Sequence, residues 1–157
     1  MSNGKDIQLV TFGLDKEVFA VPVGVVREIL DHAPAFRIPS GPDWLLGLTD
    51  VRGQGVPTVD LRLRLGLNRV ETTSDTRILI VDVSHGERVL ALGLVVDRVL
   101  TVSAVPADAV EPAPDIGIRW RSGYIQGVVR QDGGFMLLLN LAKLFSTDEA
   151  ALLPKAA

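Results

Sequence analysis

Apolar residues along this chain come in short runs that are separated by turn residues. Residues 7–12 and 18–22 are apolar runs joined by a Gly- and Asp-containing turn at 13–17, a pattern typical of a β-hairpin. Residues 78–83 and 89–96 repeat the pattern in the second half of the chain. These runs predict an all-β protein built from short antiparallel strands.

The next strands are predicted on either side of glycine turns. Residues 46–51 and 55–61 flank Arg52-Gly53, and residues 125–130 and 135–141 form a similar pair. Residues 25–31 suit a helical turn or a strand, and their β-branched content favours a strand. Arg62-Leu-Arg-Leu-Gly66 predicts a helical turn with a glycine stop.

The chain contains an internal repeat. Residues 7–29 align without a gap on residues 78–100, and residues 44–65 align on 124–145. The alignment matches Gly47 with Gly127 and Gly53 with Gly133. Chance similarity between aliphatic strands is the alternative, but glycines recurring in order favour a duplication. We therefore predict two pseudo-duplicated five-stranded barrels that share an apolar seam.

The predicted boundaries follow from this repeat. The first barrel is expected at about 7–70 and the second at about 76–145. Residues 146–157 are expected to form a helical tail, because Ser146 and Glu149 make a capping-box pattern and Pro154 would end the helix.

Composition excludes several classes of function. The 157 residues are 47% hydrophobic and 22% charged, with a net charge of −3, which predicts a globular chain with no nucleic-acid or membrane-surface preference. There is no cysteine, and His32 and His85 lack ligand spacing, so neither a metal nor a cofactor is expected. No apolar run approaches the ~20 residues needed to span a bilayer. The expected location is the cytoplasm.

Arg52 is the most informative polar residue. An arginine beside a glycine turn is hard to bury, so its planar guanidinium is available to a partner. The alternative is a surface pair with Asp50. Glu28 also has two readings: a contact to a partner, or a solvated position on an alternating strand. Asp60 and Asp97 end strands and are expected to accept hydrogen bonds from turn amides.

The order and spacing of several segments resemble the CheW family of chemosensory coupling proteins. The resemblance covers nearly the whole chain, about residues 7–145, and rests on the segments Phe19-Ala-Val-Pro-Val, Val26-Arg-Glu-Ile29, Gly47-Leu-Thr-Asp-Val-Arg-Gly53, Val56-Pro-Thr-Val-Asp-Leu-Arg62 and Leu94-Val-Val-Asp-Arg-Val99. Two positions depart from the family pattern: Asp50 stands where Asn is usual, and Arg98 where Gly is common.

The resemblance implies two small SH3-like barrels, packed together as one CheW-like domain, and an adaptor role without catalysis. The expected partners are the regulatory domain of a CheA-type histidine kinase and the cytoplasmic tip of chemoreceptors. A groove between the barrels is expected to take an apolar stripe of a receptor helix. The candidate receptor-binding residues are Val26, Glu28, Ile29, Leu48, Val51, Arg52 and Gly53, with Val96 as a further lining residue.

Two alternatives stay open. A coupling protein for another output, such as twitching or gliding motility, has the same sequence features. An enzyme or ligand carrier with a barrel cavity would require clustered polar residues that face one pocket.

Overall fold

The computed structural model describes residues 6–39, 41–112, 124–131, 133–145 and 149. The first half of the chain forms β1 (Asp6–Leu14), β2 (Glu17–Pro22), η1 (Val23–Val25), β3 (Val26–Asp31), β4 (Leu45–Val51), β5 (Gln54–Asp60) and α1 (Leu61–Arg64). The second half forms β6 (Arg77–His85), β7 (Arg88–Val96), β8 (Arg98–Pro106), η2 (Ala107–Ala109), β9 (Ile125–Gln131), β10 (Gly134–Leu139) and η3 (Leu141–Lys143).

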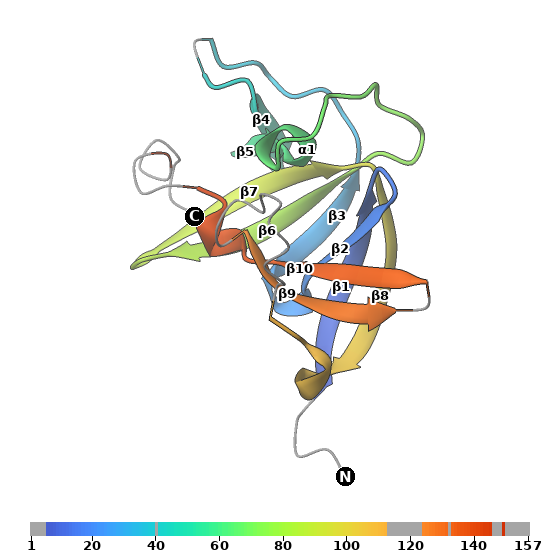
Figure 1. The fold of residues 1–157 in the computed structure, drawn as a ribbon. Coiled ribbons are helices and arrows are strands. Elements are labelled where there is room, and N and C mark those ends of the chain that lie inside the picture. Colours follow the sequence, from blue (N-terminus) through green and yellow to red (C-terminus); the bar gives the residue numbers. More distant parts are fainter. Residues whose placement is uncertain (1–5, 40, 113–123, 132, 146–148, 150–157) are drawn as a thin grey trace.

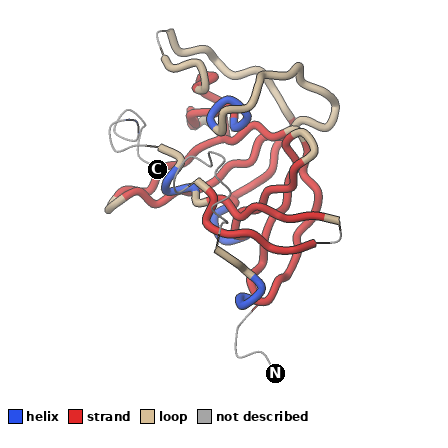
Figure 2. Tube along the Cα trace, viewed as in Figure 1, coloured by secondary structure: helices blue, strands red, loops and turns tan. Residues whose placement is uncertain are grey.

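These strands make two five-stranded sheets. Figure 1 labels the strands, and Figure 2 shows in the same view that strands make up most of the described part of the chain. Sheet A has the order β8-β1-β2-β10-β9, and sheet B has the order β3-β6-β7-β5-β4. Neighbours pair antiparallel except β2 with β10 and β5 with β7, which pair parallel. The all-β prediction with two five-stranded units is confirmed.

The two sheets have the same order of strands once the repeat is taken into account. β6 begins 71 residues after β1, at Arg77 against Asp6, and β9 begins 80 residues after β4, at Ile125 against Leu45. Sheet A therefore combines β1 and β2 of the first repeat with β8, β9 and β10 of the second. Sheet B combines β6 and β7 of the second repeat with β3, β4 and β5 of the first.

The sheets accordingly do not coincide with the predicted ranges 7–70 and 76–145. Each of those ranges holds strands of both sheets, because the first hairpin of each repeat forms a sheet with the last three strands of the other. An alignment of repeats reports which segments are equivalent but not which copy each strand pairs with. The predicted tail helix at 146–157 lies outside the described residues, apart from Glu149.

The described residues form three apolar clusters. The largest joins both sheets and includes Phe12 and Phe19 of sheet A with Leu79 and Leu92 of sheet B, all nearly or fully buried. A second cluster lies on the other face of sheet A, and a third on the other face of sheet B. Alternating side chains explain the division, because successive residues of a strand point to opposite faces. The shared apolar seam expected from the sequence is confirmed.

A short segment closes each sheet into a barrel. Phe36, which follows β3 at one edge of sheet B, exchanges two backbone hydrogen bonds of 2.8 Å with Leu48 of β4 at the other edge. Glu111, which follows β8, makes the same pair of bonds with Val128 of β9. The two closures occupy equivalent places in the repeats.

Gly47 and Gly127 make these closures possible. A Cβ atom on Gly47 would collide with the carbonyl of Phe36, and one on Gly127 would lie 2.8 Å from the carbonyl oxygen of Glu111. Gly47 also has a φ of 143°, which L-residues rarely adopt. The matched glycines of the repeat therefore serve the same structural purpose in the two barrels.

We predict that Gly47→Ala lowers the free energy of unfolding by about 3 kcal/mol or more, because a backbone clash adds to the strained φ. Gly127→Ala should cost less, since only the clash applies. Gly134→Ala is the matched control: a Cβ there meets nothing within 4 Å, so the change should stay within about 0.5 kcal/mol. Urea denaturation of the three variants checks the order, and equal losses for all three would contradict the closure argument.

Candidate functional site

The hairpin between β4 and β5 turns on two residues, Arg52 and Gly53. Their φ angles are 54° and 86°, both in the left-handed region. Two consecutive positive φ values define the tight type I′ turn that matches the twist of paired strands. The side chain of Asp50 accepts a 2.9 Å hydrogen bond from the backbone N–H of Gly53. Asp50 therefore stabilises the turn and leaves the guanidinium of Arg52 to other partners.

Arg52 projects from this turn toward β3. Its side chain is 82% exposed, and its Nη2 lies 3.4 Å from Oε1 of Glu28. The side chain of Glu28 is 25% exposed. An ion pair this open contributes well under about 1 kcal/mol to folding, so the pair leaves Arg52 available. The sequence predicted that Arg52 lies at a bend, with either Asp50 or a second molecule as the partner of its guanidinium. In the structure the side chain that pairs with Arg52 is Glu28.

Alternation along β3 places the remaining candidates on two faces. Ile29 lies opposite Leu79, a residue of the shared core, and is 43% exposed at the edge of sheet B. Glu28 lies opposite Ile80, a residue of the core inside barrel B. Val26 is half-buried against the shared core. Glu28 and Ile29 therefore point to opposite sides of the strand.

The candidates on the hairpin are also divided. Val51 packs against the core inside barrel B, whereas Leu48 is half-buried and has Gly55 beside it on the neighbouring strand. Val96 is fully buried in the shared core, so the expectation that it lines a groove is wrong. The structure thus gathers Glu28, Arg52 and Gly53 at one rim of barrel B, without placing all the predicted residues in one groove.

The junction of the barrels carries a charge cluster around Arg62. This arginine lies in α1 with its side chain 7% exposed, and its Nη1 is 2.6 Å from Asp15 Oδ1 and 2.8 Å from Asp97 Oδ2. Its Nε donates to the carbonyl of Asn68 at 2.7 Å. Asp15 lies in the β1–β2 turn of sheet A, whereas α1 follows β5 of sheet B. The cluster therefore connects the barrels.

Electrostatics keep Arg62 charged. Burial lowers the pKa of its guanidinium, but hydrogen bonds and charge from Asp15 and Asp97 outweigh this, and the net pKa is raised above its ordinary value. Because the pKa of Arg62 is higher in the folded than in the unfolded state, its charge stabilises the fold. This contribution is present at every pH below the ordinary arginine pKa and is lost only as the pH rises above it. The sequence predicted that Asp97 accepts hydrogen bonds from turn amides, and its carboxylate accepts one of 2.8 Å from the backbone N–H of Asp15. Asp60 likewise accepts from Leu63 N–H.

Arg98 belongs to the same junction. Its Nη2 donates to the carbonyl of Asp15 at 2.8 Å, and its guanidinium covers Gly13, where a Cβ would collide with it. Arg98 is one of the two departures from the family pattern noted in the sequence. The bare backbone of Gly13 provides the space that the long side chain needs.

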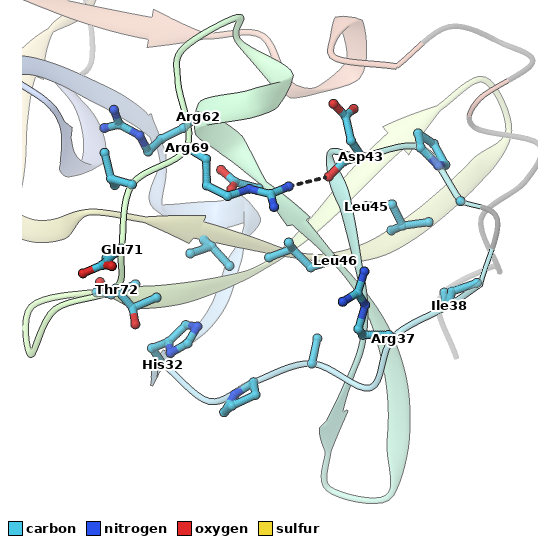
Figure 3. Close-up of a pocket in the computed structure, with 18 of the residues that line it drawn as sticks. His32, Arg37, Ile38, Asp43, Leu45, Leu46, Arg62, Arg69, Glu71 and Thr72 are labelled. Carbon is cyan, nitrogen blue, oxygen red and sulfur yellow. Dashed lines mark hydrogen bonds between the residues drawn. The ribbon is translucent and has the colours of Figure 1, made fainter.

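A surface cavity of about 850 Å³ lies next to this junction (Figure 3). One wall is the segment between β3 and β4, the other is the segment before β6, and Arg62 and Asp97 contribute to its lining. Arg69 reaches toward Asp43 and donates to its carbonyl at 3.4 Å, as Figure 3 shows. Residues of both charge signs line the cavity, which gives it no preference for a cation or an anion.

The ligand-carrier alternative required a polar pocket inside a barrel. Instead, apolar clusters fill the inner face of each sheet. Within the described ranges, no three His, Cys, Asp or Glu side chains converge as metal ligands would. No helix there has the length and hydropathy to cross a bilayer.

The structure is therefore a pair of interlocked SH3-like barrels, one of which carries an exposed charged rim. The chain matches the CheW-like domain over residues 8–149, and it belongs to the CheW family of chemotaxis adaptors. It is 29% identical to the chemotaxis protein CheW of Klebsiella aerogenes, over 96% of this chain and 88% of that protein. The probable chemotaxis protein CheW of Rhizobium etli is 30% identical, over 94% and 93%.

A solved structure agrees with the fold. The crystal structure of scaffolding protein TtCheW from Thermoanaerobacter tengcongensis superposes with a TM-score of 0.79, covers 93% of this chain and 95% of its own, and is 26% identical. The resemblance inferred from the sequence is confirmed.

We predict that Arg62→Leu lowers the free energy of unfolding by about 3 kcal/mol, because it removes the buried cation that pairs with both Asp15 and Asp97. Arg27→Leu is the control, since the Arg27–Asp82 pair is well exposed, at 39% and 38%, and should change stability by less than about 1 kcal/mol. Urea denaturation measures both. If Arg62→Leu lowers the free energy of unfolding no more than Arg27→Leu does, the Arg62 cluster does not stabilise the fold.

Proposed function

We propose that this protein is an adaptor that holds chemoreceptor cytoplasmic tips and a CheA-type histidine kinase in one signalling complex. Membership of the CheW family supports the proposal. The observation that carries the surface assignment is the Arg52 turn, where a charged side chain is held out from barrel B in a strained backbone conformation. Strain of this kind is concentrated at functional positions.

The receptor-binding surface that we propose is the rim of barrel B around Arg52, Glu28 and Gly53, continued by Ile29, Leu48, Val51 and Val26. The exposed guanidinium provides donors for carboxylates or carbonyls of a receptor helix, and Ile29 provides an exposed apolar contact. Glu28 pairs only weakly with Arg52, so a partner can replace it at little cost. Binding there exchanges one weak surface ion pair for contacts that the partner desolvates.

The kinase is proposed to bind elsewhere on the two barrels, through its own barrel of the same fold. Large exposed apolar residues outside the Arg52 rim, such as Leu100 and Val102 on the edge strand β8, are available for such a contact. We further propose that the protein acts in the cytoplasm and has no catalytic activity of its own.

The test of the adaptor function is a three-component pull-down. We expect an immobilised receptor cytoplasmic fragment to retain the CheA-type kinase in amounts that rise several-fold when this protein is added. Simultaneous binding is the physical reason, because the adaptor offers a separate surface to each partner. A protein that binds neither partner alone nor bridges them would contradict the proposal.

The Arg52 turn has its own test. Arg52→Glu places an acid beside Glu28 and Asp50, and we expect it to weaken binding of the receptor fragment at least tenfold, about 1.4 kcal/mol. Arg52→Asn removes the charge but tolerates a positive φ, so it should also weaken binding while keeping the hairpin intact. Calorimetric titration measures affinity, and thermal melting checks the fold.

Arg130→Glu is the matched control for this test. Arg130 is an exposed arginine, 73% accessible, that pairs with Glu111 at 3.0 Å on the other barrel. Its reversal changes the net charge by the same amount but leaves the Arg52 rim untouched. Equal losses of affinity for Arg52→Glu and Arg130→Glu would assign the effect to net charge, and unchanged affinity for Arg52→Glu would remove the turn from the interface.

A further inference from the structure

Arg64 occupies a cage of three aromatic rings. Its guanidinium carbon lies 5.0 Å from the ring centre of Trp44, 5.3 Å from that of Phe145 and 5.7 Å from that of Tyr124. The side chain is only 13% exposed. Cation–π attraction is strongest where water is excluded, so the rings hold the cation firmly. Trp44 and Tyr124 occupy equivalent positions in the two repeats, directly before β4 and β9. Two of the three rings of the cage therefore come from matched positions of the repeat.

Two further contacts fix the orientation of the guanidinium. Nε of Arg64 donates to the carbonyl of Leu144, and Nη2 lies 3.0 Å from the hydroxyl of Tyr124. Both groups, like the three rings, belong to residues up to Phe145. The arginine is therefore positioned by the body of the protein and does not need the segment beyond residue 145 to hold it.

The outward side of the guanidinium is occupied by the carboxylate of Glu149. Nη1 lies 3.0 Å from Oε2, and Nη2 lies 2.8 Å from Oε1. This is the parallel, two-bond geometry in which arginine binds carboxylates most strongly. Glu149 follows Phe145 by four residues, and its side chain is 29% exposed.

A cavity of about 500 Å³ adjoins the pair. Arg64, Tyr124 and Phe145 contribute to its lining, together with Lys143 and the turn at residues 84–86. Two cations, Arg64 and Lys143, face one acid, Glu149, among the charged lining residues. The excess of cations gives this cavity a preference for negative charge. The cavity also leaves space beside the Glu149 carboxylate.

We propose that the Arg64 cage is a carboxylate-binding site, which Glu149 fills in cis and which an acidic side chain of a partner peptide fills when Glu149 leaves. The preorganised guanidinium provides the affinity, and its two parallel N–H donors select a planar carboxylate. Departure of Glu149 breaks none of the contacts that orient Arg64. This site is separate from the Arg52 rim, and the proposal does not depend on the adaptor function.

The test uses the full-length chain and a fluorescein-labelled peptide with the sequence of residues 146–157. Wild-type protein has its own carboxylate at millimolar effective concentration, whereas Glu149→Ala vacates the site. We expect the peptide to bind Glu149→Ala at least tenfold more tightly than wild type in fluorescence polarisation. The same peptide with Gln in place of Glu149 should bind Glu149→Ala at least tenfold more weakly than the original peptide.

Glu111→Ala is the matched control. Glu111 also pairs with an arginine that lies over an aromatic ring, Arg130 over Phe135, but that pair is exposed. Its removal should leave peptide binding at the wild-type level. Thermal melting of each variant verifies folding, and Tyr124→Phe in the Glu149→Ala background should weaken binding because it removes a group that orients Nη2.

Several results would overturn the assignment. Equal affinity of wild type and Glu149→Ala for the peptide would show that Glu149 does not occupy the site competitively. Equal affinity of Glu149→Ala for the Glu and Gln peptides would show apolar docking in place of carboxylate recognition. Binding only of a peptide with phosphoserine at the Glu149 position would reassign the site to phosphate groups.

Discussion

The packing of the two sheets against each other is the interaction on which the rest of this structure depends. The largest apolar cluster takes side chains from both sheets, and each sheet takes strands from both halves of the chain. Neither barrel can therefore form from one repeat alone, because the β1–β2 hairpin finds its outer neighbours, β8 and β10, only in the other half. A rigid relationship between the barrels follows, and surfaces on different barrels keep a fixed separation.

The sequence predicted most of the secondary structure but not the exchange of strands. Apolar runs between glycine turns located the strands, and two constant offsets identified the repeat. Gly47 and Gly127 were paired correctly, yet the reason, a carbonyl passing above each of them, depends on the path of a distant segment. Partner choice between two equivalent hairpins is decided by packing across the shared core, which no local pattern of residues records.

Three arginines in one short segment show the same limit for the site. Arg52, Arg62 and Arg64 lie within thirteen residues and look alike in sequence. The structure exposes the first, buries the second between two aspartates and places the third among aromatic rings. Arg62 and Arg64 point apart because positions two residues apart in a helical turn do not share a face. Sequence reasoning singled out Arg52 through its glycine turn, whereas the other two lacked a local signal.

The different environments of the three arginines give each of them a different role in the protein. A buried, doubly paired arginine such as Arg62 contributes to the junction of the barrels and is costly to disturb, so it suits a fixed frame. An exposed arginine in a weak ion pair, as at Arg52, exchanges partners at little cost and suits recognition. Arg64 combines both properties, since its position is fixed while its carboxylate partner comes from the end of the chain. An adaptor needs this combination, because it must hold its own shape while its contacts are replaced by those of other proteins.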